Sequence, residues 1–403
     1  MSPKKSGAKG YETEELLRAY FLRAGFFVLR GIRLRHEGSE LTDIDLWIYE
    51  RSATLARRRT VIDIKDKGKP QAAERMFFIR GLAEIIGVEG AGVATTDSRP
   101  ALRELARKHS VLWIDGADIA RLKSSGELAN SGRLSEEQFC ALLAKVDATR
   151  SSRAFRDMIE QVKSTVGDRF GASSANVALE GAQFFAREAI SAYPLSDAAR
   201  AAARATYLAA AIAAAALDFA SADSALRPLP ERARNMTDVI RFGSDARGVS
   251  ERLQWAEAAI REYAPNGAGL AQIVRDRFNA ELKSVPAEAL AEIVVKLTKN
   301  ERLFSIARTL EWAAYDQAAV GFDDLDGEAK AFVGAVLDFV GVSRAHFARA
   351  YAASKQAPAT SSTAVSNGVA EAESEAPSPT DSSAPASSID EKEPGEDVVQ
   401  RLF

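Results

Sequence analysis

The first third of the chain alternates between two hydrophobic periods. Apolar residues recur at helical spacing in residues 13–24, 70–86 and 100–109. The short apolar or alternating pattern of strands is found in residues 26–35, 41–49, 60–65, 90–96 and 111–114. A closing helical turn is expected over residues 116–122. The order helix, three strands, helix, strand, helix, strand predicts a mixed sheet with helices on both faces.

The next part of the chain has almost no strand pattern. We expect helices at residues 135–166, 176–192, 198–220, 236–241, 251–263, 269–283, 286–298, 301–319 and 328–353. Prolines separate several of these segments. The alanine-rich helix around Ala209 is apolar on nearly every side, so we expect it at the centre of a helical bundle.

These patterns predict an α/β N-terminal domain, then an all-α domain and a disordered tail. The predicted boundaries are a flexible leader at 1–9, the α/β domain at 10–123, a linker at 124–134, the all-helical domain at 135–353 and the tail at 354–403. The tail is rich in Ala, Ser, Pro, Thr and Glu and buries too little apolar surface to offset its ordering entropy. It ends in VVQRLF, which is either a docking peptide for a protein partner or a frayed end.

Charge and composition change this picture only modestly. The formal net charge is -3, but residues 1–123 hold 23 Lys+Arg against 17 Asp+Glu, whereas residues 351–403 hold 3 against 9. A basic N-terminal part is where a polyanion would bind, although this excess is also ordinary for a soluble domain. The single cysteine fits a reducing cytoplasm. No secretory signal is visible and the most apolar run, 209–216, is too short to span a bilayer, so we expect a cytoplasmic protein without a membrane partner.

Candidate chemistry is concentrated in residues 41–67, where two predicted strands each carry polar residues two positions apart. Asp43 and Asp45 lie on the first strand, and Asp63 and Lys65 on the second. Period-two geometry places both members of each pair on one face, so pairing of the strands would bring three carboxylates and an ammonium together. Such a set suits metal-dependent hydrolysis of a phosphodiester. Cross-strand ion pairs on a solvated face are the alternative interpretation.

The order of these residues resembles the PD-(D/E)xK restriction-endonuclease-like superfamily over residues of about 10–122. GYETEELLRAYFLRAGFFVLRGIRLR is similar to its first helix, TDIDLWI to its second motif and VIDIK to its third. VATTDSRPALRELARKHSVLWIDGADIARL resembles the end of Mrr-type restriction nuclease domains. The glycine-rich lead into the second motif is reduced here to Gly38, and the turn between the second and third strands is longer and more basic than in compact relatives.

The resemblance implies an αβββαβ core and assigns roles to individual residues. It implies that Asp45, Asp63 and Glu14 bind Mg²⁺, with Mn²⁺ as an alternative ion, and that Lys65 orients the attacking water. Asp43 takes the flanking acidic position, and Gln71 on the next helix is an accessory candidate that also fits a helix surface.

A run of three arginines precedes the second acid-bearing strand. Arg57, Arg58 and Arg59 are candidates for DNA phosphate contacts, and the alternative is an exposed turn that charge keeps soluble.

The sequence therefore predicts a metal-dependent DNA endonuclease, active in restriction of foreign DNA or in DNA repair. The alternative is a catalytically silent nuclease-fold protein that binds DNA or acts as a scaffold, with the helical domain and tail recruiting partners. The helical domain would supply recognition, a homodimer surface or a partner site. RNA stays open as a substrate, because nothing in the sequence reads a 2′-hydroxyl.

Overall fold

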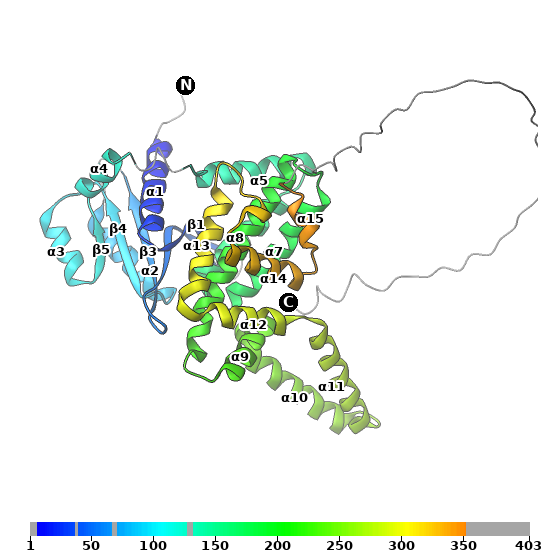
Figure 1. Cartoon of the computed structure of the whole chain (residues 1–403). Helices are drawn as coiled ribbons and strands as arrows, with labels where there is room; N and C mark the ends of the chain where they lie inside the picture. Colours follow the sequence, from blue (N-terminus) through cyan, green and yellow to red (C-terminus); the bar gives the residue numbers. More distant parts are fainter. Residues whose placement is uncertain (1–5, 37–38, 67–70, 127–131, 352–403) are drawn as a thin grey trace, which may run out of the picture. The chain divides into compact units, whose positions relative to one another are not determined.

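A computed structural model describes residues 6–36, 39–66, 71–126 and 132–351 (Figure 1). These residues belong to one compact unit, Met1–Ala353. The first five residues of the predicted leader, part of the predicted linker and the whole predicted tail with its VVQRLF end lie outside the described residues.

The N-terminal segment contains the helices and strands in the predicted order. They are α1 (Ser6–Arg23), β1 (Phe27–His36), β2 (Ser39–Arg51), β3 (Arg57–Lys65), α2 (Ala72–Ile85), β4 (Gly90–Thr95), α3 (Pro100–Lys108), β5 (Val111–Ile114) and α4 (Gly116–Ser124). Asp115 caps α4 through a reciprocal capping box with Asp118, which explains the helical turn after the last strand.

The strands form one mixed sheet in the order β1-β2-β3-β4-β5. The first three strands are antiparallel neighbours, and the α2 and α3 crossovers make β3, β4 and β5 parallel. Side chains of α1 and α4 pack with Val28, Ile48 and Ile62 on one face. Side chains of α2 and of the helical region pack on the other face. The predicted mixed sheet with helices on both faces is confirmed.

The remainder of the described chain is helical, as predicted. Its α-helices are α5 (Glu136–Arg150), α6 (Ala154–Arg169), α7 (Ala172–Ser191), α8 (Asp197–Ala220), α9 (Leu229–Phe242), α10 (Ala246–Tyr263), α11 (Gly267–Ser284), α12 (Ala287–Leu297), α13 (Arg302–Tyr315), α14 (Gly327–Phe339) and α15 (Arg344–Ala348). Short 3₁₀ turns separate several of them. Two predicted helices are each divided. Ser151 adopts the left-handed conformation after α5, and Gly341 does so after α14.

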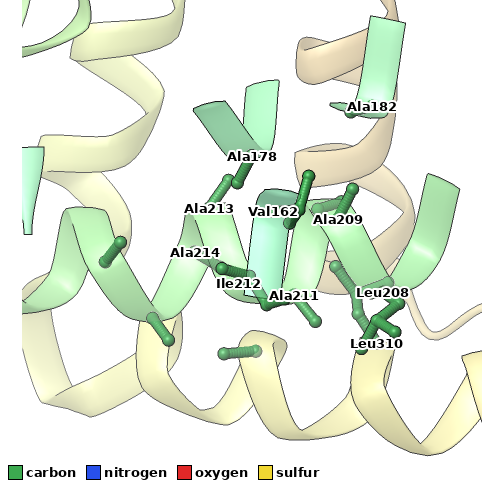
Figure 2. Close-up of a cluster of buried hydrophobic side chains, with 14 of the residues drawn as sticks. Val162, Ala178, Ala182, Leu208, Ala209, Ala211, Ile212, Ala213, Ala214 and Leu310 are labelled. Carbon is green, nitrogen blue, oxygen red and sulfur yellow. The ribbon is translucent and has the colours of Figure 1, made fainter. Parts of the chain in front are cut away.

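The alanine-rich helix α8 lies at the centre of the bundle, which confirms the prediction. Figure 2 shows Ala213 beside Ala178 of α7. It also shows Leu208 beside Leu310 of α13. Within the described residues this is the one helix long and apolar enough to cross a membrane, but 89% of its most apolar window is buried inside the protein. That burial is typical of a core helix.

The sheet and the helical bundle share one hydrophobic core. The rings of Trp47 and Tyr49 on β2 pack against Phe170, with centroids 4.6 and 5.3 Å away. Beside these rings, the buried Asp218 of α8 accepts hydrogen bonds from Tyr49 Oη at 2.6 Å and from Arg51 at 2.5 Å. The helical region therefore covers one face of the sheet and shares its hydrophobic core.

Candidate functional site

The candidate site begins where β2 and β3 separate. Their ladder of paired residues runs from Arg51↔Arg57 to Leu46↔Ile62 and includes no pair beyond it. One residue further along, Asp45 Oδ2 accepts the backbone N–H of Ile64 at 2.6 Å. A carboxylate thus takes the place of a backbone carbonyl, which satisfies the amide of β3 and fixes the Asp45 side chain between the two strands.

A glycine on the neighbouring strand shapes this position. Gly31 of β1 has a φ of +62° and lies at the level of Asp45 in the β1–β2 ladder. A residue in the left-handed conformation interrupts the alternation of a strand, and accordingly Leu29 and Ile32, three residues apart, both enter the larger core. The local twist at Gly31 thus coincides with the point where β2 leaves β3.

Lys65 stands between the two central carboxylates. Its Nζ lies 3.5 Å from Asp45 Oδ2 and 3.5 Å from Asp63 Oδ1. Asp63 is buried, Asp45 is half-buried and the Lys65 side chain is 28% exposed. The structure therefore brings these three predicted site residues together at the end of β3, where solvent reaches them. This end of the strands is called the edge below.

Glu14 approaches the same place from α1. Its Oε2 accepts a hydrogen bond of 2.7 Å from Arg30 Nε, and Arg30 is buried. Arg30 also contacts Glu15 at 2.7 Å and Glu137 of α5 at 2.6 Å. Burial raises the pKa of Glu14, Arg30 opposes that rise, and the negative charge of Asp45 adds to it.

The pKa of Asp45 is also raised. Burial is the main cause, and Asp63 adds to it, whereas Lys65 and the Ile64 amide lower the pKa without fully compensating. Two neighbouring acids with raised pKa values mark a place where negative charge is not fully matched, which is typical of functional sites.

Arg75 of α2 is a residue that the sequence patterns did not single out. Its guanidinium binds both oxygens of Asp63, with Nε 2.8 Å from Oδ2 and Nη2 close to Oδ1. Arg75 lies one helical turn after Gln71, so helical spacing offered a signal for it. Gln71 itself is exposed and is 3.4 Å from Glu74.

The segment that follows Lys65 is tied to two helices. Asp66 Oδ2 accepts a hydrogen bond of 2.6 Å from the buried Thr13 of α1 and lies 3.1 Å from Lys123 Nζ of α4. These contacts hold the end of β3 beside the part of α1 that carries Glu14.

Within the described residues, no hydrogen bond or ion pair joins the remaining candidates to Asp45, Asp63 or Lys65. Asp43 is exposed. Arg57 binds Asp218 at 3.4 Å and Arg59 binds Glu89 at 2.6 Å, so both are in ion pairs within the fold. Arg58 is exposed and lies 3.9 Å from Glu50.

The three arginines begin β3, whereas Asp63 and Lys65 end it. Lys65 comes seven positions after Arg58, which is roughly 23 Å along a strand at the usual rise.

The chemistry of the donors fits a hard cation. Asp45, Asp63 and Glu14 offer carboxylate oxygens, which Mg²⁺ and Mn²⁺ prefer. In this structure each carboxylate faces a cationic side chain, and no group of three acidic, His or Cys side chains within the described residues is arranged to hold a metal. Comparisons with known protein families, curated proteins and solved structures found no match.

Proposed function

We propose that the chain is a metal-dependent DNA endonuclease of the PD-(D/E)xK type, acting in restriction of foreign DNA or in DNA repair. The observation that carries this proposal is the position of the Lys65 ammonium, 3.5 Å from each of two carboxylates at the end where β2 and β3 separate. The mixed sheet and the helix that carries Glu14 beside it support a restriction-endonuclease-like core.

Asp45, Asp63 and Glu14 would hold Mg²⁺, or Mn²⁺ as the alternative. When bound, such an ion polarises the phosphate and lowers the pKa of a water. Lys65 orients the attacking water and stabilises the negative charge that develops on the phosphate.

Asp63 and Glu14 must each leave an ion pair with an arginine before they can bind a metal ion. Arg75 would leave Asp63, which its 27% exposed side chain permits. Arg30 would release Glu14 yet stay paired with Glu15 and Glu137, so no buried cation is left without a partner.

The test is cleavage of supercoiled, linear and branched DNA in Mg²⁺ or Mn²⁺. Lys65→Ala and Asp63→Ala should each lower the cleavage rate at least about 100-fold, because each removes a group that acts in the transition state. Lys145→Ala removes an exposed lysine of α5 and should leave the rate unchanged. Cleavage that persists in both site variants would overturn the assignment, and RNA substrates in parallel establish which nucleic acid is cut.

The second candidate is a catalytically silent nuclease-fold protein that binds DNA or acts as a scaffold. The bidentate contact of Arg75 with Asp63 favours it, because a guanidinium occupies the oxygens that a metal would need. Binding without cleavage on every substrate, in either metal, would support this candidate.

A further inference from the structure

A groove lies between the end of α1 and one face of α13, away from the candidate site. Its volume is about 290 Å³, and it is lined by Leu22, Ser305, Arg308, Thr309 and Trp312. The last four residues have the spacing i, i+3, i+4, i+7, so they share one face of α13. Arg308 Nη2 donates a hydrogen bond of 3.4 Å to the Leu22 carbonyl oxygen, which joins this face of α13 to the end of α1.

Arg308 is a half-buried cation without an acidic partner in the described part of the chain. Its Nε is buried and has no hydrogen-bond partner there. Burial lowers its pKa, and no acidic group contributes to the shift. By contrast, Arg302 at the start of the same helix contacts Glu328 at 3.0 Å. A half-buried cation that lacks a counter-charge is costly, and an anion in the groove would remove that cost.

The other lining residues add to this recognition. Ser305 and Thr309 can donate hydroxyl hydrogen bonds to an anion beside the guanidinium. Trp312 is 37% exposed. Arg133 covers one face of its ring, 4.4 Å from the ring centroid, so the opposite face is the one a ligand can stack on. Trp312 lies one helical turn from Arg308, about 5–6 Å between Cβ atoms. The groove thus combines an anion site with an aromatic surface at a fixed short separation.

We propose that this groove binds a nucleoside phosphate, with the phosphate held by Arg308, Ser305 and Thr309 and the base stacked on Trp312. Only a sugar separates base from phosphate in a nucleotide, which matches the short separation of the two parts of the groove. Aromatic side chains stack on bases of any sequence, so we expect little base preference. The ligand is a free nucleotide or one unit of a nucleic-acid strand. This site goes beyond the proposed nuclease site, since Leu22 is eight residues from Glu14, about 12 Å along α1.

The test measures binding of a fluorescent mononucleotide and of a fluorescent eight-residue oligonucleotide by anisotropy. It uses the full-length Lys65→Ala protein in EDTA, so that cleavage cannot occur and the outcome is independent of the proposed nuclease function. Arg308→Gln should weaken binding about 10- to 100-fold, and Trp312→Leu about 5- to 100-fold. Arg308→Lys keeps the charge and should restore part of the affinity. Arg302→Gln removes an exposed charge from the same helix outside the groove and should change nothing.

Each outcome decides a part of the proposal. Binding of the mononucleotide identifies a free-nucleotide site, and binding of the oligonucleotide alone identifies a strand site. Unchanged affinity in Arg308→Gln and Trp312→Leu, with melting temperatures close to that of the parent, would overturn it. Competition by inorganic phosphate with no effect of Trp312→Leu would also overturn it, because the groove would then be a simple anion site.

Discussion

Two clusters of acids and bases in this molecule look alike by composition and differ in their electrostatics. One is the candidate site, where Lys65 lies 3.5 Å from Asp45 and from Asp63 at an edge that solvent reaches. The other is buried where α1 meets the bundle. There Arg18 lies 2.6 Å from Glu311 of α13, and Lys163 lies 2.8 Å from Glu136 of α5.

The acids of the two clusters shift in opposite directions. Burial would raise the pKa of Glu136, but Lys163, Arg18 and the Tyr315 hydroxyl outweigh it and lower that pKa to about 2. At the candidate site burial prevails, and the pKa of Asp45 stays above its usual value. The buried cluster has matched its charges and stabilises the fold, whereas at the candidate site the nearby cations do not fully offset the burial of the carboxylates.

The largest effect on stability should come from the buried cluster. Glu311→Gln leaves the fully buried Arg18 and the buried Arg133 without the carboxylate that both contact. We expect a loss of about 3–5 kcal/mol in the free energy of unfolding, measured by chemical denaturation. Glu328→Gln removes an exposed carboxylate and should cost little. Equal small losses in both variants would contradict the contrast between the clusters.

The next largest effect should be the pH dependence of stability that the buried cluster contributes. The folded pKa of Glu136 is about 2 and its ordinary value is 4.5. Its ionised form therefore stabilises the fold above pH 4.5, and that contribution, on the order of 3 kcal/mol, is lost as the pH falls towards 2. Glu136→Gln should be less stable at neutral pH and show a flatter decline between these values. An acid decline as steep as in the parent protein would disprove this assignment.

A smaller effect is expected at the glycine that shapes the edge. Gly31→Ala places a side chain in the left-handed conformation at φ +62°, although nothing lies within 4 Å of the added Cβ. The backbone strain should cost about 1–2 kcal/mol of stability, and a shift of Asp45 should lower the rate of the proposed DNA cleavage. Gly81→Ala adds a Cβ in open space within α2 and should be neutral or stabilising. If both variants behave alike, the conformation at Gly31 is not important for the site.

The smallest effect concerns the competition between Arg75 and a metal ion. The contact between Arg75 and Asp63 is partly exposed, so it should contribute up to about 1 kcal/mol. Arg75→Gln should therefore tighten Mn²⁺ binding up to about fivefold in a calorimetric titration. The same titration on Asp63→Asn should show weaker binding. Mn²⁺ binding that is equal in both variants and in the parent would favour the silent alternative.

Periodicity predicted most of the fold and part of the site. The order of helices and strands followed from apolar spacing, and the burial of α8 from its uniform alanine composition. Two-residue spacing placed Asp63 and Lys65 on one side of β3, within reach of Asp45. The sequence could not show that Arg57 and Arg59 form ion pairs within the fold, or that an extended strand places them far from Lys65. Their contact with DNA phosphate stays a prediction.

The sequence by itself determined the local elements, the pairing of Asp63 with Lys65 on one side of a strand and the helical nature of the second segment, because these depend on side chains a few positions apart. Only the tertiary structure decided which charges meet. It placed Arg75 on Asp63, Arg30 between Glu14 and Glu137, and Arg308 in a groove whose described lining residues include no acid. Such contacts join residues up to hundreds of positions apart, so they depend on how helices pack against the sheet and leave no periodic trace in the chain.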